Sequence, residues 1–591
     1  MKNLDNEKLY HSFMAGAKEV IKQKRVLNEI NVFPVADGDT GTNLASLMQS
    51  ILNDSTLGDD QKSTLKSIAD AALIGARGNS GIIFAQYLNG FIISLENDEN
   101  EITVEQFVAS AEKAVPYAYD AIENPVEGTM ITLMKEFGVA VKKFKNSAKD
   151  FVELLGRGVD HLKVSLSETT ESLAVLKKNN VVDAGAKGFF HFFDGFMKFV
   201  KNEEMDELYD ETFDEESQIP EGEDFSNEQY RYCTEALITG ENLEAKDIKV
   251  AMHELGDSLV VAGHKEKVRI HIHTDVPQDV FFKLRDFGQI VQQKVDDMKK
   301  QHEVAHARKY NIALVTDSIA DLPQAYIDEH QIQQIPLNLM IEDANYYDKL
   351  TITSERFYQF MDELETYPTS SQPNQKQMEN FFSYLSTYYD KIMVISVSSA
   401  MSGTYNVLKQ AIKSLDDKTD VRLIDSRQNS GAEGLLVMRA QEMIIANKSL
   451  DEIEKALLTL REKTKILVSV KTLKYMVRSG RVSKVTGIIG KVANLKPVVS
   501  IDKDGEGIIF AKGLSLKSSN KKIRKHIEKV MAGGGIERYA IVHANAENRA
   551  EQYAEIYTGI IGQKPAYTMD ISTIVAMSAG IGTVAIAYIR K

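Results

Sequence analysis

Apolar residues recur at helical spacing through most of the first 200 positions of the chain. The stretches 8–30, 63–76 and 150–169 are the clearest examples, and each predicts an amphipathic helix. Four glycine-rich pieces, "DGDTGTN", "GARGNSG", "VEGTM" and "DAGAKG", fall between these helices or at their starts. Polar, glycine-rich loops on a helical scaffold predict a ligand site gathered at one end of a bundle.

The pattern changes twice further along the chain. Residues 202–227 contain many acids and neither Lys nor Arg, which predicts a solvated linker. Residues 228–307 then alternate strand and helix patterns, as a small α/β domain would. We therefore divide the chain into domains at residues 1–201, 228–307 and 308–591, with 202–227 as the linker.

A longer α/β pattern occupies the last domain. Its apolar strands are "IALVTD", "KIMVISVS", "DVRLIDS", "KILVSV" and "YAIVHA", and helical stretches separate several of them. This alternation predicts a largely parallel sheet.

Composition narrows the class of protein. The 591 residues are too many for one core. The sequence contains no run of about 18 apolar residues, so we expect no membrane-spanning helix. The first residues lack the apolar core of a secretory signal and the chain has one cysteine, so we expect a cytoplasmic protein. The net charge of −15 argues against general nucleic-acid binding, although it leaves room for a local basic patch.

Asp37 and Asp39 are the first candidates for chemistry. If the chain is extended there, both carboxylates face the same side, and closely spaced carboxylates favour a hard cation such as magnesium. The following "TGTN" offers backbone N–H groups and hydroxyls at a helix start, which suits phosphate. The structural alternative is an ordinary turn in which Asp and Thr only cap the helix.

The wider context resembles the DhaL/DAK2 kinase family. The matching segments are "NVFPVADGDTGTN" (31–43), "GARGNSGIIFAQ" (75–86), "PVEGTMIT" (125–132) and "VVDAGAKGFF" (181–190). The resemblance implies an all-α, eight-helix barrel that binds ATP and two magnesium ions at one end. It implies Asp37 and Asp39 as catalytic magnesium ligands. The further nucleotide- and phosphate-binding residues it implies are Asn31, Thr40, Thr42, Asn43, Ser80, Gly81 and Thr129.

Asn31 separates two branches of that family. Glycerone kinases have a third Asp at this position, whereas the fatty acid kinase branch begins the motif "NVFPV", as this chain does. The resemblance is therefore closer to the fatty acid kinases than to the dihydroxyacetone kinases.

The middle domain carries a sparse metal-ligand pattern. His271 and His273 are two apart in a predicted strand and so lie on one face, and Cys233 lies about forty residues earlier. One thiol and two imidazoles are three plausible zinc ligands, and the alternative is a buried thiol beside ordinary histidines. The segments "YCTE" and "IHIHT" resemble the middle domain of bacterial fatty acid kinases, which implies zinc bound by Cys233, His271 and His273 near the path of phosphoryl transfer, with His271 counted among the catalytic residues.

The last domain resembles the DegV family of fatty-acid-binding proteins, with an α/β, two-lobed fold. The matches are "VTDSIADLP" (315–323), "TSSQP" (369–373), "SSAMSGTYN" (398–406), "IDSRQNSG" (424–431) and "LKYMVRSGRVSK" (473–484). The resemblance implies a fatty acid whose carboxylate is held by hydroxyls in glycine-rich turns, and it retains the family Arg as the catalytic candidate Arg481. The implied substrate-binding residues are Ser318, Thr369, Ser402, Gly403, Thr404 and Ser578.

Two positions depart from the DegV pattern. Ser578, in "SAGIG", stands where the family has a His that contacts the carboxyl group, and Lys517 stands at a family Arg. Lys keeps the charge but loses the bidentate fork of Arg. With these two departures, the sequence alone does not establish whether the domain delivers its own lipid.

Together the resemblances imply an ATP-dependent fatty acid kinase-like phosphotransferase that converts a fatty acid to an acyl phosphate. One alternative is a dihydroxyacetone (glycerone) kinase, and another is a lipid-binding regulator whose kinase-like half senses nucleotide. Partners compatible with the resemblance are a fatty acid, ATP, a separate DegV-type lipid carrier, an acyltransferase, the membrane surface and a second copy of the chain.

Overall fold

The computed structural model describes residues 2–33, 38–95, 101–202, 229–342, 344–364, 366–415, 418–479 and 495–591. The chain divides into two compact units, Met1–Asp296 and Asp297–Lys591. The predicted linker at 202–227 lies almost wholly outside the described residues.

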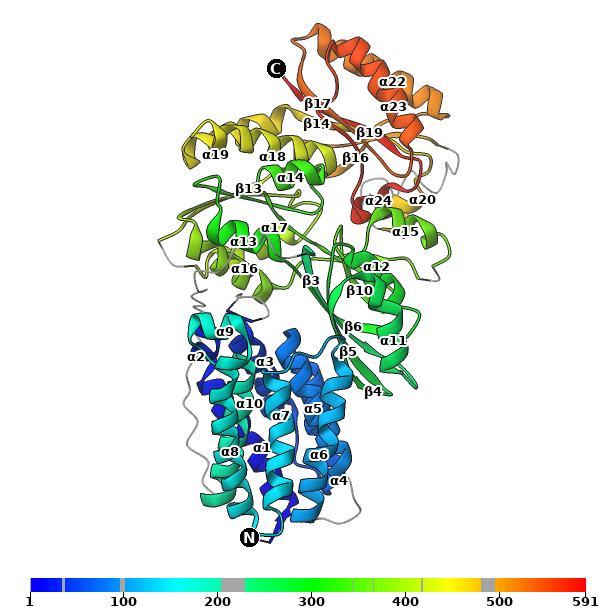
Figure 1. The fold of residues 1–591 in the computed structure, drawn as a ribbon. Coiled ribbons are helices and arrows are strands. Elements are labelled where there is room, and N and C mark those ends of the chain that lie inside the picture. Colours follow the sequence, from blue (N-terminus) through cyan, green and yellow to red (C-terminus); the bar gives the residue numbers. More distant parts are fainter. Residues whose placement is uncertain are drawn as a thin grey trace. The chain divides into compact units, whose positions relative to one another are not determined.

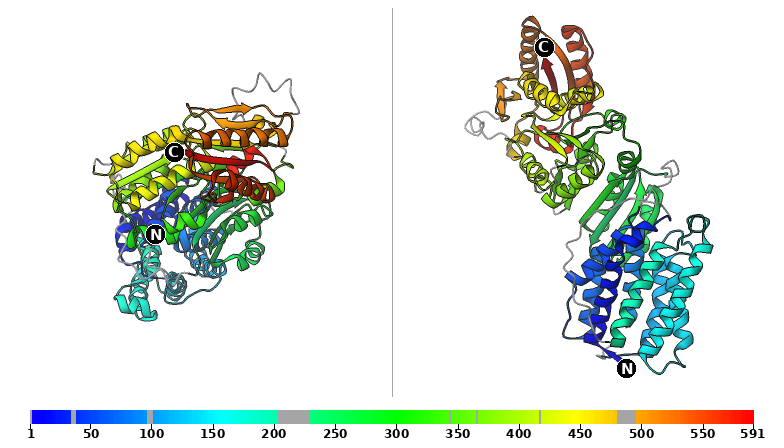
Figure 2. Two further views of the ribbon diagram at one scale, coloured as in Figure 1. Left: turned by 90° about the horizontal axis from the view of Figure 1, so that it is seen from above. Right: turned by 90° about the vertical axis from the view of Figure 1, so that its left-hand side faces the viewer.

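Eight long helices in the described part of the first unit form a closed ring. Contacts run from α1 through α3, α4, α5, α6, α7 and α8 to α10, which packs back against α1 (Figure 1). The right-hand view of Figure 2 shows these helices running side by side. Their bounds, with those of two short helices and a small strand pair, are β1 Asn3–Asp5, α1 Asn6–Lys22, α2 Lys24–Glu29, α3 Thr40–Asp54, α4 Gln61–Gly75, α5 Gly78–Leu95, β2 Glu101–Thr103, α6 Val104–Ala121, α7 Met130–Phe144, α8 Phe151–Ser172, α9 Ala174–Asn179 and α10 Ala184–Asn202.

The helix predictions from periodicity are confirmed. The stretch 8–30 forms α1 and α2, with a break at Gln23, and 63–76 and 150–169 fall in α4 and α8. Aspartates cap three of these helices: Asp5 accepts from the amide of Lys8, Asp60 from that of Ser63 and Asp150 from that of Glu153.

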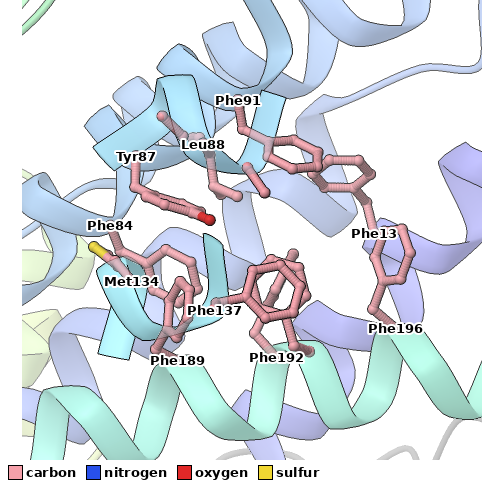
Figure 3. Packing of buried hydrophobic residues seen from close by; sticks show 14 of the residues in the cluster. Phe13, Phe84, Tyr87, Leu88, Phe91, Met134, Phe137, Phe189, Phe192 and Phe196 are labelled. Carbon is pink, nitrogen blue, oxygen red and sulfur yellow. The ribbon is translucent and has the colours of Figure 1, made fainter. Parts of the chain in front are cut away.

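Aromatic side chains fill the middle of the ring. Phe13, Phe91, Phe137, Phe192 and their neighbours come from different helices and point toward one another (Figure 3). Edge-to-face packing is frequent: the Phe107 and Phe151 rings, for example, lie 5.6 Å apart at 89°. The interior is thus a packed core, which leaves the ends of the helices to carry chemistry.

A four-stranded sheet completes the first unit, with strand order β4-β5-β3-β6. Strand β5 pairs antiparallel with both β3 and β4, which places Cys233 opposite His273 and Glu235 opposite His271. The elements are β3 Tyr232–Thr239, α11 Ala245–Met252, η2 His253–Leu255, β4 Asp257–His264, β5 Lys267–Thr274, α12 Pro277–Leu284 and β6 Gln289–Asp297.

This sheet packs against the helical bundle. The amide of Gly263 in β4 donates to Oε1 of Gln86 in α5 at 2.8 Å. Asp70 in α4 pairs with His264 at 3.1 Å and with Lys267 at 3.2 Å, and these two partners lower the pKa of its carboxyl group against the opposing effect of burial. The sheet and the bundle therefore form one unit, and residues from both can belong to one site.

The second unit contains two main sheets. One has the order β13-β12-β7-β8 and is parallel, and the other has the order β16-β15-β14-β19-β17-β18. A smaller sheet joins β10, β9 and β11. We call the parts built on the two main sheets the first and second lobes.

The bounds in this unit are α13 Met298–His306, β7 Ala313–Asp317, α14 Gln324–Glu329, β8 Gln333–Ile335, β9 Asn338–Ile341, β10 Ala344–Tyr347, α15 Ser354–Phe360, β11 Thr369–Ser371, α16 Gln375–Tyr388, β12 Lys391–Ser396, α17 Thr404–Ile412, β13 Asp420–Asp425, α18 Ser430–Ile445, α19 Leu450–Lys463, β14 Thr464–Ser469, α20 Lys474–Arg478, β15 Val498–Ile501, β16 Gly507–Ala511, α22 Leu516–Ala532, β17 Ile536–His543, α23 Glu547–Ile561, β18 Thr568–Asp570, α24 Thr573–Ala579 and β19 Val584–Arg590.

The expectation of one largely parallel sheet is wrong for the second half of this unit. Strands β7, β12 and β13 are parallel as predicted, but β14 pairs antiparallel with β15 and β19, and β17 pairs antiparallel with β19. Strands buried on both faces have the same apolar pattern in either orientation, so periodicity could not separate the two cases.

Helix α24 of the second lobe is held by carboxylates of the first. Asp321 accepts from the amide of Ser572 and Asp348 accepts from the amide of Thr573, both at 2.8 Å. Burial raises the pKa of Asp348 to about 6. The N-terminus of α24 favours negative charge, which helps to keep these acids in place.

None of the helices in the described part of the chain is both long and apolar enough to span a bilayer.

Candidate functional site

The start of α3 carries the first predicted motif. Asp39 is the residue before the helix, but its side chain makes no capping hydrogen bond, so capping does not explain this acid. Thr40 donates to Oδ1 of Asn31 at 2.8 Å in a buried contact, and Asn28 holds both the amide and the hydroxyl of Thr42. Asp37 lies outside the described residues.

The second glycine-rich loop packs directly on α3. Gly78 has φ +55°, and a Cβ there would lie 2.3 Å from Nδ2 of Asn43, so glycine is required both for conformation and for space. Gly81 also packs over Asn43, because a Cβ on it would lie 3.4 Å from the Asn43 carbonyl oxygen. Asn43, Gly81 and the adjacent Ser80 are thus brought together, as predicted for residues of one loop cluster.

The third and fourth motifs meet the second one. A Cβ on Gly185 would lie 3.4 Å from Oγ of Ser80, 3.4 Å from Oδ1 of Asp183 and 3.3 Å from Cβ of Met130, the first residue of α7. Thr129, the residue before α7, donates to the carbonyl of Val126 at 2.8 Å. All four motifs therefore converge at one end of the bundle.

Asp183 is a buried acid at this end that had no assigned role in the sequence. It is 5% exposed and accepts from the amide of Ala186 at 2.7 Å, at the start of α10. Burial outweighs this hydrogen bond and raises the pKa of Asp183 to about 6. Its motif, "VVDAGAKGFF", was recognised, but nothing in the pattern distinguished its acid from a helix cap.

The three predicted zinc ligands lie together on one face of the sheet. One ligand atom each from Cys233, His271 and His273 lies within 4.8 Å of the other two, and Sγ of Cys233 is 3.8 Å from Nδ1 of His271. Tetrahedral zinc with bonds of about 2.0–2.3 Å spaces its ligands by roughly 3.5 Å, so a small closure accommodates the ion. Nε2 of His271 is buried and has no hydrogen-bond partner in the described part of the chain.

The protonation states of the two kinds of ligand differ. Burial, followed by the charge of His271, lowers the pKa of His273 to about 3, which keeps its imidazole neutral for ligation. Burial, followed by the charge of Asp296, raises the pKa of the Cys233 thiol well above its usual value, so a bound cation would have to displace its proton. The types of ligand and their spacing fit zinc.

Glu235 joins this face to the glycine loops. Its Oε1 accepts from the amide of Gly78 at 2.7 Å and lies 3.7 Å from Nδ1 of His271. Its Oε2 lies 3.3 Å from the guanidinium of Arg269 and 3.9 Å from that of Arg77. Burial would raise the pKa of Glu235, but the nearby imidazole of His271, the charge of Lys294 and the other partners lower it to about 2.

Glu235 was missed at the sequence level although it ends the recognised "YCTE" motif. A lone acid in a strand gives no sign of its partners, and all four of those described above depend on the pairing of β3 with β5 and on packing against the bundle.

A cavity with about 80 Å³ of accessible volume lies between the lobes of the second unit. Its lining is mainly apolar and comes from β14, β15, β17 and α24, with Met401 and the start of α18 on the other lobe. Polar groups are few, and they include Ser578 and His543. We call this space the apolar cavity.

Of the predicted carboxylate-binding residues, only Ser578 lines the apolar cavity. Ser402 and Thr404 share a hydrogen bond of 2.8 Å, and a Cβ on Gly403 would lie 2.1 Å from Oε1 of Gln372, so the "SGT" and "TSSQP" turns are adjacent. Thr369 is exposed in β11.

Ser318 has a structural role in the described fold, because it donates to Asp348 at 2.7 Å and accepts from the amide of Leu337. Arg481 lies outside the described residues, and Lys517 is exposed in α22. His543, which lines the apolar cavity from β17, was not predicted, since a single His after a strand is a weak signal.

Three family profiles match the chain in order. They are the DAK2 domain at residues 34–198, the FakA-like middle domain of fatty acid kinases at 229–305 and the "uncharacterised protein, DegV family" at 311–591.

Curated relatives match part of the chain. An uncharacterized protein of Staphylococcus epidermidis is 34% identical over 343 residues, which cover 54% of this chain and 62% of that protein. One of Staphylococcus aureus is 34% identical over 310 residues, or 50% of this chain and 56% of that protein. The match thus spans less than two thirds of the length of these relatives.

Solved structures similar to the second unit include "DegV, a fatty acid binding protein from Bacillus subtilis". It is 27% identical with a TM-score of 0.45, and the match covers 48% of this chain and 100% of that protein. A second is a DegV family protein from Thermus thermophilus that is described as binding fatty acid. It is 25% identical with a TM-score of 0.43, and the match covers 48% of this chain and 100% of that protein.

Proposed function

This chain is a fatty acid kinase-like protein that joins a DAK2 domain, a FakA-like middle domain and a DegV domain, and we propose that it transfers the γ-phosphoryl group of ATP to a fatty acid carboxylate. A carboxylate oxygen forms the new bond to the γ-phosphorus. The bond from that phosphorus to the bridging oxygen breaks, and ADP leaves with the electron pair. The product is an acyl phosphate, and because the carboxylate is already ionised, no general base is needed.

The observation that carries the proposal is the contact of Glu235 with Gly78. It places the Cys–His–His face of the middle domain against the glycine loop that follows α4. The first unit thus combines glycine-rich loops that suit a nucleotide with a set of side chains that suits zinc. This combination favours phosphoryl transfer, because charge neutralisation and positioning supply most of the catalysis in such reactions.

Each part of the site has a role in this proposal. Asp39, together with Asp37, would hold magnesium, which would neutralise charge on the phosphates, and the amides at the starts of α3 and α5 would offer donors to phosphate oxygens. Zinc at Cys233, His271 and His273 would supply a fixed positive charge beside the transferring group. Arg77 is a further cation at this end and is oriented by Glu235.

The apolar cavity is the proposed site of the acyl chain. Its lining is mainly apolar, with a few polar groups, which suits an acyl chain with a carboxylate at one end. Each buried methylene contributes about 0.8 kcal/mol, so the chain dominates affinity and the few polar groups orient the carboxylate. Ser578 and His543 are two of the polar groups in its lining that could serve that purpose.

The test is a product analysis of the purified chain with γ-labelled ATP and magnesium. Separate reactions contain a fatty acid, dihydroxyacetone or no acceptor. Label in an acyl phosphate supports the proposal. Label in dihydroxyacetone phosphate, or ATP binding without transfer to either acceptor, overturns it in favour of a glycerone kinase or of a nucleotide-sensing regulator.

A further inference from the structure

A second cavity in the DegV domain, with about 210 Å³ of accessible volume, is polar and strongly cationic. Its walls come from strands β14, β15 and β19, helix α22, the last turn of α19 and the turn after β13. Its lysine and arginine side chains are Arg427, Arg461, Lys463, Lys465, Lys503 and Arg590, and its acids are Glu462 and Asp502. We call it the cationic cavity.

The acids do not neutralise these cations. Glu462 is engaged by Arg427 at 3.1 Å and by Arg461 at 3.5 Å. Lys463, Lys465, Lys503 and Arg590 have no carboxylate within ion-pair distance in the described part of the chain. The six cations exceed the two acids by four charges, in a protein whose net charge is −15.

The cations in the cavity also repel one another. Burial lowers the pKa of Lys465, and the charge of Arg590 lowers it further. The same two cations and Lys529 add to the effect of burial in lowering the pKa of His526, which donates to or accepts from the Tyr588 hydroxyl at 2.7 Å. Like charges held close without a counter-charge cost stability, and an anion between them would remove that cost.

The side-chain amide of Gln428 also has a hydrogen-bonding atom without a partner. It lines the cavity, is 4% exposed and donates from Nε2 to the carbonyl of Thr464, but its Oε1 has no hydrogen-bond partner in the described structure. A hydroxyl group on the ligand would give that oxygen a donor. The complementary chemistry is therefore phosphate for the cations and hydroxyl for Gln428.

The cationic cavity is distinct from the apolar cavity but adjoins it. Ile501 lines both, and in β14 Lys465 faces the cationic cavity while its neighbour Ile466 faces the apolar one. Strands β14 and β15 therefore lie between a cavity that suits a lipid and a cavity that suits an anion.

We propose that the cationic cavity binds a soluble, phosphorylated polyol carrying at least two phosphate charges. The site is independent of ATP turnover, so it stands or falls separately from the kinase activity. Occupancy beside β14 and β15 gives a phosphorylated metabolite direct contact with the strands that line the acyl site.

Calorimetric titration of the full chain tests this proposal. The probes are fructose 1,6-bisphosphate, which carries phosphates and hydroxyls, and pyrophosphate, which carries charge alone, in magnesium-free buffer at physiological salt. We expect the wild-type chain to bind the bisphosphate more tightly than pyrophosphate. Lys465→Gln/Arg590→Gln should weaken binding by about tenfold or more, because two charge-assisted contacts are lost.

The matched control is Lys521→Gln/Lys525→Gln, which removes the same charge from the exposed face of α22. It should change affinity by less than about twofold, since unspecific surface charge is screened at this salt concentration. If the cavity variant fails to fold by circular dichroism, Lys463→Gln/Lys503→Gln replaces it.

Three results would overturn the proposal. They are no binding of either probe by the wild-type chain, equal losses in the cavity and control variants, and binding only to vesicles of anionic lipid. The last result would identify a lipid headgroup as the source of the phosphate.

Discussion

At the scale of single residues, Asp39 is the acid on which the nucleotide site depends most. It precedes α3 without capping it, and it lies at the end of the bundle where four glycine-rich motifs converge. We expect Asp39→Asn to lower phosphoryl transfer by about a hundredfold or more, because the metal-held phosphates lose one anchoring charge. Steady-state kinetics and magnesium-dependent nucleotide binding measure this.

The control for Asp39 is Asp59→Asn, which removes an exposed carboxylate from the same domain. It should leave both quantities unchanged. Full activity in Asp39→Asn would remove this residue from the magnesium site.

The zinc assignment makes a prediction that does not depend on activity. Metal analysis of the purified chain should find about one zinc per chain, and Cys233→Ser/His271→Ala should contain almost none. Glu235→Gln should retain zinc with about tenfold weaker affinity, because it keeps the shape of the side chain but loses the charge that faces His271.

Zinc content that is unchanged in the Cys233→Ser/His271→Ala protein would return this face to the alternative of an ordinary buried thiol and histidines. His302→Ala, a change at a histidine in α13 of the second unit, is the control and should not affect zinc content.

The sequence predicted residue types better than it predicted their partners. Cys233, His271 and His273 could be grouped because His-x-His in a strand fixes a common face, and β5 confirmed it. Asp183, Glu235 and His543 could not be recognised in the same way, because their environments arise from burial and from contacts distant in the chain.

At the scale of elements, α18 contains a buried acid that should make stability depend on pH. Glu433 is 0% exposed, and neither carboxyl oxygen has a hydrogen-bond partner in the described structure. Burial, with the charges of Asp317 and Asp321, raises its pKa well above 4.5. Since the folded chain then binds the proton more tightly than the unfolded chain, the free energy of unfolding falls as the pH rises above 4.5.

Replacing Glu433 should therefore stabilise the second unit. Glu433→Met removes the unsatisfied acid at similar size and should raise the free energy of unfolding by about 1–3 kcal/mol near neutral pH, with a smaller gain near pH 4. Denaturant unfolding at the two pH values measures this. Glu551→Met, on the exposed face of α23, should show no such pH-dependent gain, and a destabilised Glu433→Met protein would contradict the account.

The elements themselves were largely predictable, but their pairing was not. Helical periodicity identified α1, α4 and α8, and alternation identified β3, β4 and β5. Whether β14 and β17 belonged to the parallel sheet depended on which strands they met, and that is decided by packing of the second lobe rather than by their own sequence. Similarly, the segments that contain Thr369 and Ser402 were found from motifs, whereas the residues that line the apolar cavity were not, apart from Ser578.

At the scale of the whole molecule, the account requires one chain to carry both the kinase site and the acyl site. We expect Ser578→Ala to co-purify with lipid as the wild-type chain does, because the tail dominates affinity, but to form less acyl phosphate, because Ser578 is a polar group of the apolar cavity. Mass spectrometry of bound lipid and a transfer assay measure the two quantities.

A companion change tests the polar end of the apolar cavity. Ser578→His introduces a second imidazole beside His543 and should strengthen binding of a fatty acid carboxylate, whereas Val575→Phe on the same helix should fill the cavity and reduce bound lipid. Lipid content unaffected by Val575→Phe would place the acyl chain elsewhere.

The most direct test of the central claim uses a fatty acid whose carboxylate carries oxygen-18. The purified chain is incubated with this fatty acid, ATP and magnesium, with no added carrier protein. The masses of the products are then measured by mass spectrometry. The account predicts an acyl phosphate that retains both labelled oxygens, because a carboxylate oxygen attacks the γ-phosphorus. Recovery of unchanged fatty acid, with only unlabelled inorganic phosphate released from ATP, would contradict it.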